Sequence, residues 1–153
     1  MPTNPSGGMT LDEIKTLIPH REPMLLIDEV IQRQDGSIVC RRTFRDNEFF
    51  LQGHFPEYPL VPGVMLCEAA MQAGAVLAAG MCEEAGIPVA TRLTDARFRR
   101  MVRPGDTVEI HVEISERSAN VFFMRAKLML GEAVAARCEF ACMITKPADA
   151  QTP

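Results

Sequence analysis

The sequence has no tryptophan, only one tyrosine and an aromatic share of 6%. Hydrophobic residues nevertheless make up 47% of the chain, and ten of its 153 residues are methionine. A chain of this length and composition can bury a core as one domain, which excludes disordered and fibrous proteins. We therefore expect a single globular domain whose core is filled mainly by small and flexible side chains.

An excess of positive charge is also missing, since the formal net charge is −4. A protein that binds nucleic acid over its whole surface needs surplus lysine and arginine to neutralise phosphates, so we expect no nucleic-acid partner. One segment departs from this acidic average. Residues 91–103 contain a single acid, Asp95, and five basic side chains: Arg92, Arg97, Arg99, Arg100 and Arg103.

Residue spacings typical of metal and disulfide chemistry are absent as well. The five cysteines include no CxxC pair, and histidine and cysteine do not occur at zinc-ligand spacing, so we expect no metal. The odd cysteine number and the lack of a basic and then apolar leader are typical of a reduced, cytoplasmic protein. The uncharged run 69–82 is too short to span a bilayer, so we expect no membrane partner.

Both ends of the sequence are rich in proline, glycine and small polar residues. We predict disordered tails at residues 1–8 and 147–153 around one domain, residues 9–146. Thr10 and Glu13 have the spacing of a capping box, which predicts a short helix up to Ile18.

The rest of the domain shows two hydrophobic periodicities. Residues 24–44 contain two apolar runs around Asp35-Gly36, which predicts a β-hairpin, and residues 108–144 alternate with the period of antiparallel strands. Residues 47–63 contain three prolines and form a loop. Residues 64–85 predict one long helix that is apolar on nearly all sides and ends at Gly86. The expected class is α+β, with the sheet wrapped around this helix.

Glu68 is the only ionisable side chain, cysteines apart, between residues 62 and 82, and Gln72 lies one turn later on the same helix face. It has two interpretations. It could be a structural or interface residue hydrogen-bonded to Gln72. Alternatively it is a catalytic acid, because burial raises the pKa of a carboxyl group and keeps its proton near neutral pH.

Two features just before this helix add a base and a polarising group. His54 lies between Gly53 and Pro56 in the proline-rich loop, where the fixed backbone could orient its ring as a base. Pro62 suits the first helical position and Val61 before it offers no side-chain cap, so the amides of Gly63 and Val64 would be free donors that could bind a carbonyl oxygen. His20 and His111 have simpler interpretations, as a loop or capping contact and as a polar strand residue.

Five motifs together resemble one enzyme family. They are LIPHR (17–21), LLID (25–28), GHFPEYPLVPGVMLCEAAMQ (53–72), ARFRR (96–100) and VRPGD (102–106). Their order and spacing are similar to the 3-hydroxyacyl-[acyl carrier protein] dehydratases of bacterial type II fatty acid synthesis. The resemblance implies a hotdog fold, a homodimer that often forms a trimer of dimers, and a cytoplasmic enzyme without a cofactor of its own.

The resemblance also implies roles for individual residues. His54 would take the C2 proton, Glu68 of the neighbouring subunit would protonate the departing hydroxyl, and the Gly63 amide would bind the thioester carbonyl. Phe55, Val64 and Gln72 are expected to contact the substrate. Glutamate at position 68 resembles the branch of the family that only dehydrates. The sequence departs from the usual pattern at three positions that bear on the loop and the acyl tunnel: Glu57, Val61 and Met71.

The partner implied by the resemblance is acyl carrier protein, which holds the substrate on phosphopantetheine. We expect Arg99, Arg100 and Arg103 to dock this acidic protein, whereas Arg92 and Arg97 fit intramolecular contacts better. Two alternatives stay open at this point. A hotdog thioesterase would use Glu68 to activate water, and a non-catalytic acyl-binding subunit would keep the fold alone.

Overall fold

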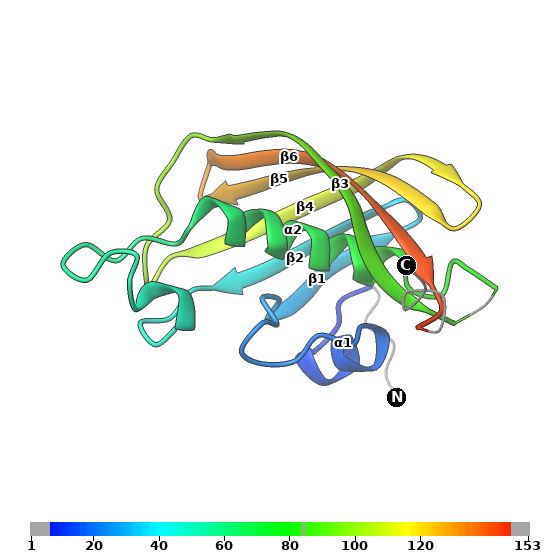
Figure 1. The fold of residues 1–153 in the computed structure, drawn as a ribbon, viewed down its shortest axis with the longest axis horizontal. Coiled ribbons are helices and arrows are strands. Elements are labelled where there is room, and N and C mark those ends of the chain that lie inside the picture. The colour runs from blue at the N-terminus through cyan, green and yellow to red at the C-terminus, as the bar shows by residue number, and fades with distance from the viewer. Residues whose placement is uncertain (1–6, 84, 148–153) are drawn as a thin grey trace.

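The computed structural model describes residues 7–83 and 85–147, and within them one antiparallel sheet wraps around a long helix (Figure 1). The elements in chain order are α1 (Leu11–Leu17), β1 (Glu29–Gln34), β2 (Ser37–Thr43), the short 3-10 helix η1 (Phe49–Leu51), α2 (Gly63–Ala78), β3 (Ile87–Phe98), β4 (Thr107–Ser118), β5 (Val121–Leu130) and β6 (Ala133–Thr145). The strand order is β1-β2-β4-β5-β6-β3. This confirms the α+β class and the hotdog arrangement. The expected tails fall largely on residues 1–6 and 148–153, which lie outside the described residues.

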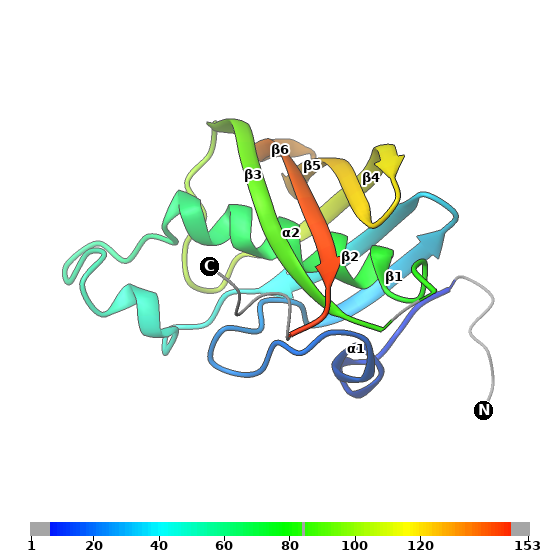
Figure 2. The same cartoon turned by 45° about the vertical axis from the view of Figure 1, so that its right-hand side comes forward.

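Helix α2 lies across the concave side of the sheet, with strands of the sheet curving around it (Figure 2). Gly74 shows how closely the two layers approach. A Cβ atom added there would lie 2.6 Å from Met124 Sδ and 2.7 Å from the Phe140 ring. The small residues of this helix therefore permit close helix-to-sheet contact, as the composition predicts. Among the described residues, no helix has the length and apolarity needed to cross a bilayer.

A larger side chain at position 74 should loosen this contact. We expect Gly74→Val to lower the free energy of unfolding by about 1–3 kcal/mol, since the buried Phe140 ring must move to admit it. Urea unfolding followed by circular dichroism measures the change. Gly53→Val is the control, because no atom lies within 4 Å of a Cβ placed at Gly53. Equal stability of the two variants would contradict close packing at Gly74.

The predicted end of α2 at Gly86 is wrong. The helix stops at Ala78, and the Ala79 amide donates the capping bond to the Ala75 carbonyl oxygen. Gly80 then adopts a φ of +82°, the left-handed conformation that favours glycine at the end of a helix. The nearer glycine therefore ends the helix.

The local predictions near the N-terminus agree better with the structure. Thr10 and Glu13 form the expected capping box, and Asp35-Gly36 joins β1 to β2. The predicted run from Met24, however, becomes a strand only at Glu29. The reason lies in α2, because the Gln72 side chain takes up the backbone hydrogen bonds of Met24 and Leu26.

Both cysteines of β6, Cys138 and Cys142, are buried in the core, and all five cysteines are free. Burial raises the pKa of the Cys142 thiol to about 11 and that of Cys40 to about 12. These thiols therefore act as small apolar core groups.

Strand β3 forms one edge of the sheet, and among the described residues it pairs with β6 alone. It is 12 residues long and mostly exposed, including the large apolar side chains of Leu93 and Phe98. A long, unpaired edge with exposed apolar side chains is a template for another strand.

Candidate active site

The loop that carries His54 projects beyond the sheet in both ribbon views (Figures 1 and 2). Its backbone is closed on itself, because Phe55 and Tyr58 exchange N–H to carbonyl bonds of 3.2 and 3.1 Å. The Val61 amide then donates to the Val102 carbonyl oxygen at 2.9 Å. The Arg103 guanidinium lies 4.8 Å from the centre of the Tyr58 ring and donates to its hydroxyl. The loop is thus anchored to the segment that follows β3.

The His54 imidazole is oriented by two contacts within this loop. Its Nδ1 lies 2.8 Å from the Leu60 carbonyl oxygen. A carbonyl oxygen only accepts, so Nδ1 carries the hydrogen and Nε2 of the neutral ring keeps its lone pair. The ring stacks on Phe55 with 4.3 Å between centroids, and the peptide bond between these two residues is cis. His54 therefore presents a basic nitrogen in a fixed direction.

Helix α2 starts at Gly63, with Pro62 as its N-cap residue instead of its first helical residue, and the predicted lack of a side-chain cap is confirmed. Within the described residues, the Gly63 and Val64 amides have no hydrogen-bond acceptor. The Phe98 ring lies over Gly63, where a Cβ atom would come within 2.8 Å of it. Val64 is 68% exposed. The helix start thus offers two free donors beside an accessible apolar surface.

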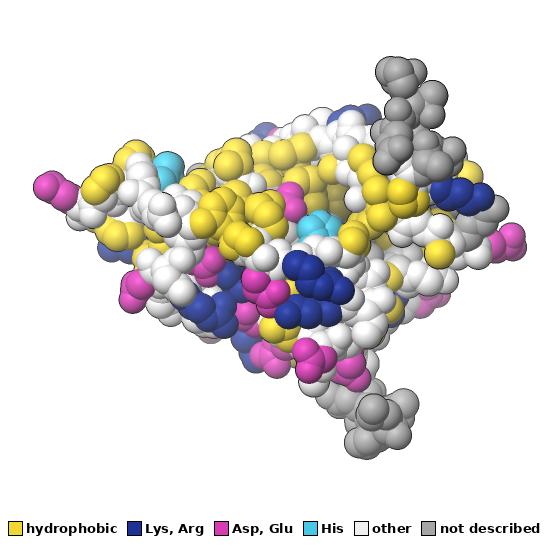
Figure 3. All heavy atoms as spheres, turned by 60° about the horizontal axis from the view of Figure 1, so that its bottom comes forward, with side chains coloured by type: hydrophobic (Ala, Val, Ile, Leu, Met, Phe, Trp, Pro, Cys, Tyr) yellow, Lys and Arg dark blue, Asp and Glu magenta, His cyan; other side chains and the backbone are white. Residues whose placement is uncertain are grey.

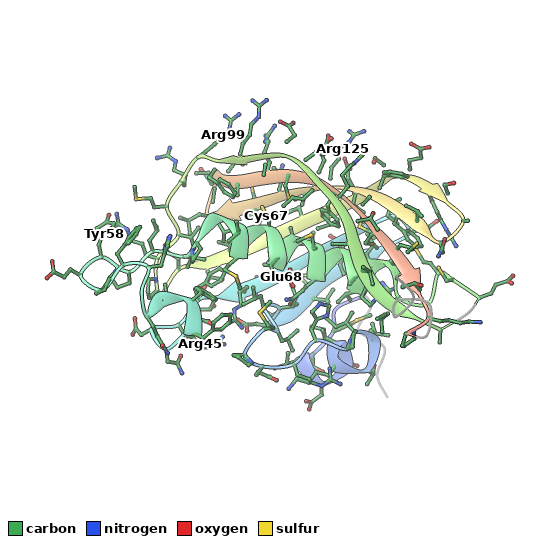
Figure 4. The ribbon with its side chains drawn as sticks, viewed as in Figure 1. Arg45, Tyr58, Cys67, Glu68, Arg99 and Arg125 are labelled. Atoms are coloured by element: carbon green, nitrogen blue, oxygen red, sulfur yellow. The ribbon has the colours of Figure 1, made fainter. Side chains whose placement is uncertain are left out.

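Glu68 projects from the middle of α2, on the side away from the upper strands (Figure 4). Its Oε1 atom accepts a 3.0 Å hydrogen bond from Gln72 Nε2. The same Gln72 amide group donates to the Met24 carbonyl oxygen, and its Oε1 accepts from the Leu26 amide, both at 2.7 Å. Gln72 is only 1% exposed and both of its hydrogens are used within the chain, so it orients Glu68.

His20 is the residue at this site that sequence reasoning missed. It was expected as a loop or capping contact, yet its Nε2 lies 3.9 Å from Glu68 Oε1. Burial lowers the pKa of His20, and the nearby Glu68 carboxylate partly opposes this effect. Residues 20 and 68 lie on different elements, and no local pattern relates their positions. Only the folded chain brings them together.

The structure does not join His54 to Glu68 within one chain. His54 contacts Leu60 and Phe55 in the projecting loop, whereas Glu68 contacts Gln72 and His20. Figure 4 shows Tyr58 of the loop far out to one side and Glu68 beneath the middle of the helix. The expected burial of Glu68 is also incomplete, since its side chain is 25% exposed in the single chain.

The arginines of residues 91–103 divide into engaged and free side chains. Arg97 forms a 3.0 Å ion pair with Asp95, Arg92 lies over the Phe123 ring, and Arg103 holds Tyr58. The side chains of Arg99 and Arg100 are exposed and contact no partner among the described residues. Arg99 points away from α2, off the outer side of the sheet (Figure 4). Only these two therefore remain free for an external anion.

No group of three metal-ligating side chains occurs within residues 7–83 and 85–147. The site consists of the oriented His54 imidazole, the free amides at the start of α2 and the Glu68 carboxyl, which contacts Gln72 and His20. These are the elements of acid–base chemistry beside a carbonyl group.

Comparison with known proteins places these residues in a family context. The FabA-like domain model matches residues 18–139. A protein from Petrotoga mobilis is 37% identical over 138 residues, covering 90% of this chain and 99% of its own length. One from Clostridium kluyveri is 41% identical over 136 residues, covering 88% of this chain and 94% of its own length. Both are named 3-hydroxyacyl-[acyl-carrier-protein] dehydratase FabZ.

Solved structures support the fold. The dehydratase heterocomplex ApeI:P from Xenorhabdus doucetiae superposes with a TM-score of 0.78 at 14% identity, covering 90% of this chain and 93% of that one. An uncharacterised protein from Pyrococcus horikoshii superposes with a TM-score of 0.63 at 21% identity, covering 81% and 87%. The matched segment contains His54, Gly63 and Glu68, and the chain belongs to the FabA-like family.

Proposed function

We propose that the chain dehydrates (3R)-hydroxyacyl chains on acyl carrier protein to the trans-2-enoyl thioester, as a hydro-lyase of fatty acid biosynthesis. The two relatives named for this activity match along about nine tenths of the chain. Within the structure, the contact from His54 Nδ1 to the Leu60 carbonyl oxygen carries the proposal. It leaves Nε2 as an oriented base in the loop that precedes the free amides of the α2 start.

In the proposed reaction, His54 Nε2 removes the C2 proton of the substrate. The developing negative charge on the thioester oxygen is stabilised by the Gly63 amide at the positive end of the helix. Glu68 gives its proton to the C3 hydroxyl, which leaves as water while the electron pair from C2–H forms the C2=C3 double bond. The residues of the chain supply each proton transfer, so we propose no cofactor besides the phosphopantetheine that arrives with the substrate.

The site requires a second copy of the chain, because His54 and Glu68 have no contact in one subunit. We propose a homodimer in which each site takes His54 from one subunit and Glu68 from the other. The unpaired edge of β3 supports this assembly. Figure 3 shows the apolar surface that such a partner would cover, with a histidine and an acidic side chain close together within it. A trimer of such dimers is the larger assembly that the resemblance implies.

We propose that two exposed apolar residues contact the substrate. Phe55 is stacked against the base, and Val64 lies beside the helix amides. Gln72 acts through Glu68 instead, since it is buried. Of the three departures from the family pattern, Glu57 is exposed in the loop, Val61 is buried and Met71 is partly buried beside the core. Met71 is therefore the departure best placed to alter the bore of an acyl tunnel.

One assay tests this function against its alternatives. The protein is incubated with 3-hydroxyacyl thioesters of several chain lengths, and enoyl absorbance and free thiol are followed together. We expect enoyl product without thiol release. Thiol release without enoyl product would identify a thioesterase, and neither signal on carrier-linked substrates would identify a non-catalytic subunit. Either result would overturn the proposal.

Charge reversal should reveal carrier docking. We expect Arg99→Glu combined with Arg100→Glu to raise the KM for carrier-linked substrate about tenfold or more at low salt, because an acidic partner loses two attractive charges. The rate with a short thioester mimic should hardly change. Steady-state kinetics with both substrates measure the difference.

Arg117→Glu is the matched control for docking. It reverses the charge of one arginine at the far end of β4, where the side chain lies over Phe122 and binds the Met81 carbonyl oxygen. We expect similar kinetics with both substrates for this control. Equal losses on both substrates in the Arg99 and Arg100 variant would exclude docking there.

A further inference from the structure

We propose that His20 is a positioning residue of the dehydratase site, in which its neutral imidazole and Gln72 together hold the Glu68 carboxyl in its donating orientation. This inference rests on the dehydration proposed above. It concerns a partly buried histidine that the reaction steps do not use. The loop before β1 carries His20 to helix α2, where it faces Glu68.

The two contacts to Glu68 converge on one oxygen. Gln72 Nε2 donates to Oε1 at 3.0 Å, and His20 Nε2 lies 3.9 Å from the same atom. Within the described residues, no contact is made by the other carboxyl oxygen, Oε2. When Glu68 carries the proton that it donates, the oxygen that accepts the Gln72 N–H group is the carbonyl oxygen, so the acidic hydrogen would lie on Oε2. The pair therefore sets which oxygen faces the substrate.

The His20 backbone is fixed from both sides. The Arg21 guanidinium donates to the carbonyl oxygens of Lys15, Ile18 and His20 itself, at 2.9, 3.0 and 2.7 Å. Farther along the loop, Gln72 binds the backbone of Met24 and Leu26. A histidine on so constrained a loop keeps its distance to α2. The 3.9 Å separation is longer than a hydrogen bond, and such contacts commonly shorten once substrate is bound.

The environment of His20 favours the neutral ring. Its Nδ1 atom is buried and lacks a partner among the described residues, which suits a lone pair better than an N–H group. Nε2 then carries the hydrogen that faces Glu68, the reverse of the arrangement in His54. Burial lowers the pKa of His20, as does Arg21, while Glu68 of α2 raises it. Lys15 of α1 is paired with Glu22 at 2.7 Å.

Protonation of His20 would reverse its effect on Glu68. A full positive charge within 4 Å stabilises the carboxylate and so removes the proton that Glu68 must donate. The pKa of His20 lies below its ordinary 6.5, so the ring is neutral at neutral pH and gains its proton only below that value. We expect kcat to fall as the pH drops through this range.

Two substitutions separate positioning from structure. His20→Phe keeps a flat ring but removes the N–H group, and should lower kcat about 10- to 100-fold at an unchanged KM for a short 3-hydroxyacyl thioester. His20→Gln keeps an N–H donor and cannot titrate. It should restore most of kcat and abolish the His20 contribution to the acid limb of the pH profile. His111→Gln is the matched control, since His111 also faces a glutamate, Glu109 at 3.3 Å, but on the polar side of β4.

The outcomes distinguish this inference from the proposed function. Wild-type kcat and an unchanged pH profile in His20→Phe would overturn the inference alone. Equal loss of kcat in His20→Phe and His20→Gln, with lowered melting temperatures, would assign His20 a structural role and also overturn it. Absence of dehydration in the wild-type protein would overturn the proposed function and this inference with it.

Discussion

His54→Ala and Glu68→Gln should each lower kcat/KM for dehydration by about 100- to 10,000-fold, the range expected for loss of a general base or acid. His54→Ala removes the Nε2 lone pair that the Leu60 contact orients. Glu68→Gln is close to isosteric, and its carbonyl oxygen can still accept the hydrogen bond from Gln72. It has no acidic proton, however, so the hydroxyl would leave without one. Enoyl absorbance with a short 3-hydroxyacyl thioester measures both losses.

Both variants should fold normally, which separates chemistry from stability. His54 is only partly buried in a loop, and Glu68 is a quarter exposed in the single chain. Thermal unfolding should therefore change little. Glu109→Gln is the matched carboxyl control, because it makes the same change on β4, away from α2. Wild-type turnover in a variant without His54 would refute the mechanism.

Co-expression of the two inactive variants should restore dehydration. In a mixed dimer, the His54→Ala subunit supplies an intact Glu68 and the Glu68→Gln subunit supplies an intact His54. One of the two shared sites is then complete. Random pairing makes half of the dimers mixed, so about a quarter of wild-type activity should return. The opposite result is expected if each subunit holds a whole site, because every site would then carry one substitution.

Differently tagged subunits allow the mixed dimer to be purified before assay, where about half of wild-type activity is expected. The control is a mixed dimer of His54→Ala with His54→Gln, which cannot complete a site and should stay inactive. An inactive mixed dimer of the two catalytic variants would contradict the shared site. The losses of kcat/KM in the two single variants would then have no geometric explanation, because His54 and Glu68 do not contact each other within one chain.

Much of the fold follows from rules that act between neighbours in sequence. The Thr10 and Glu13 capping box, the Asp35-Gly36 turn and the alternation along β4 to β6 each depend on a few adjacent residues, and each is confirmed. The uncharged run 69–82 likewise indicated a buried helix, and most residues of α2 are buried. His54, Gly63 and Glu68 could also be chosen as candidate site residues. A histidine in a proline-rich loop, a helix start without a side-chain cap and a lone carboxylate can all be recognised in the sequence.

The remaining features depend on residues far apart in the chain. Gln72 binds backbone groups 46 and 48 residues away, and this contact keeps Met24 and Leu26 out of a strand. Gly80 lies inside an apolar run, so the sequence pattern did not identify it as the end of the helix. In the sequence Arg103 and Arg99 are equivalent candidates for carrier docking. In the structure the Arg103 guanidinium lies over the Tyr58 ring. Sequence spacing carries no information about such pairs, because their energies arise only after the chain has folded.

The sequence by itself thus determined the chemistry available to this protein: a histidine in a rigid loop, free amides at a helix start and an acid in an apolar helix. The tertiary structure decided how that chemistry is arranged. It separated His54 from Glu68 within one chain and placed His20 against Glu68. The physical reason is that residue types set what a group can donate or accept, whereas long-range packing alone sets the distance and direction in which it does so.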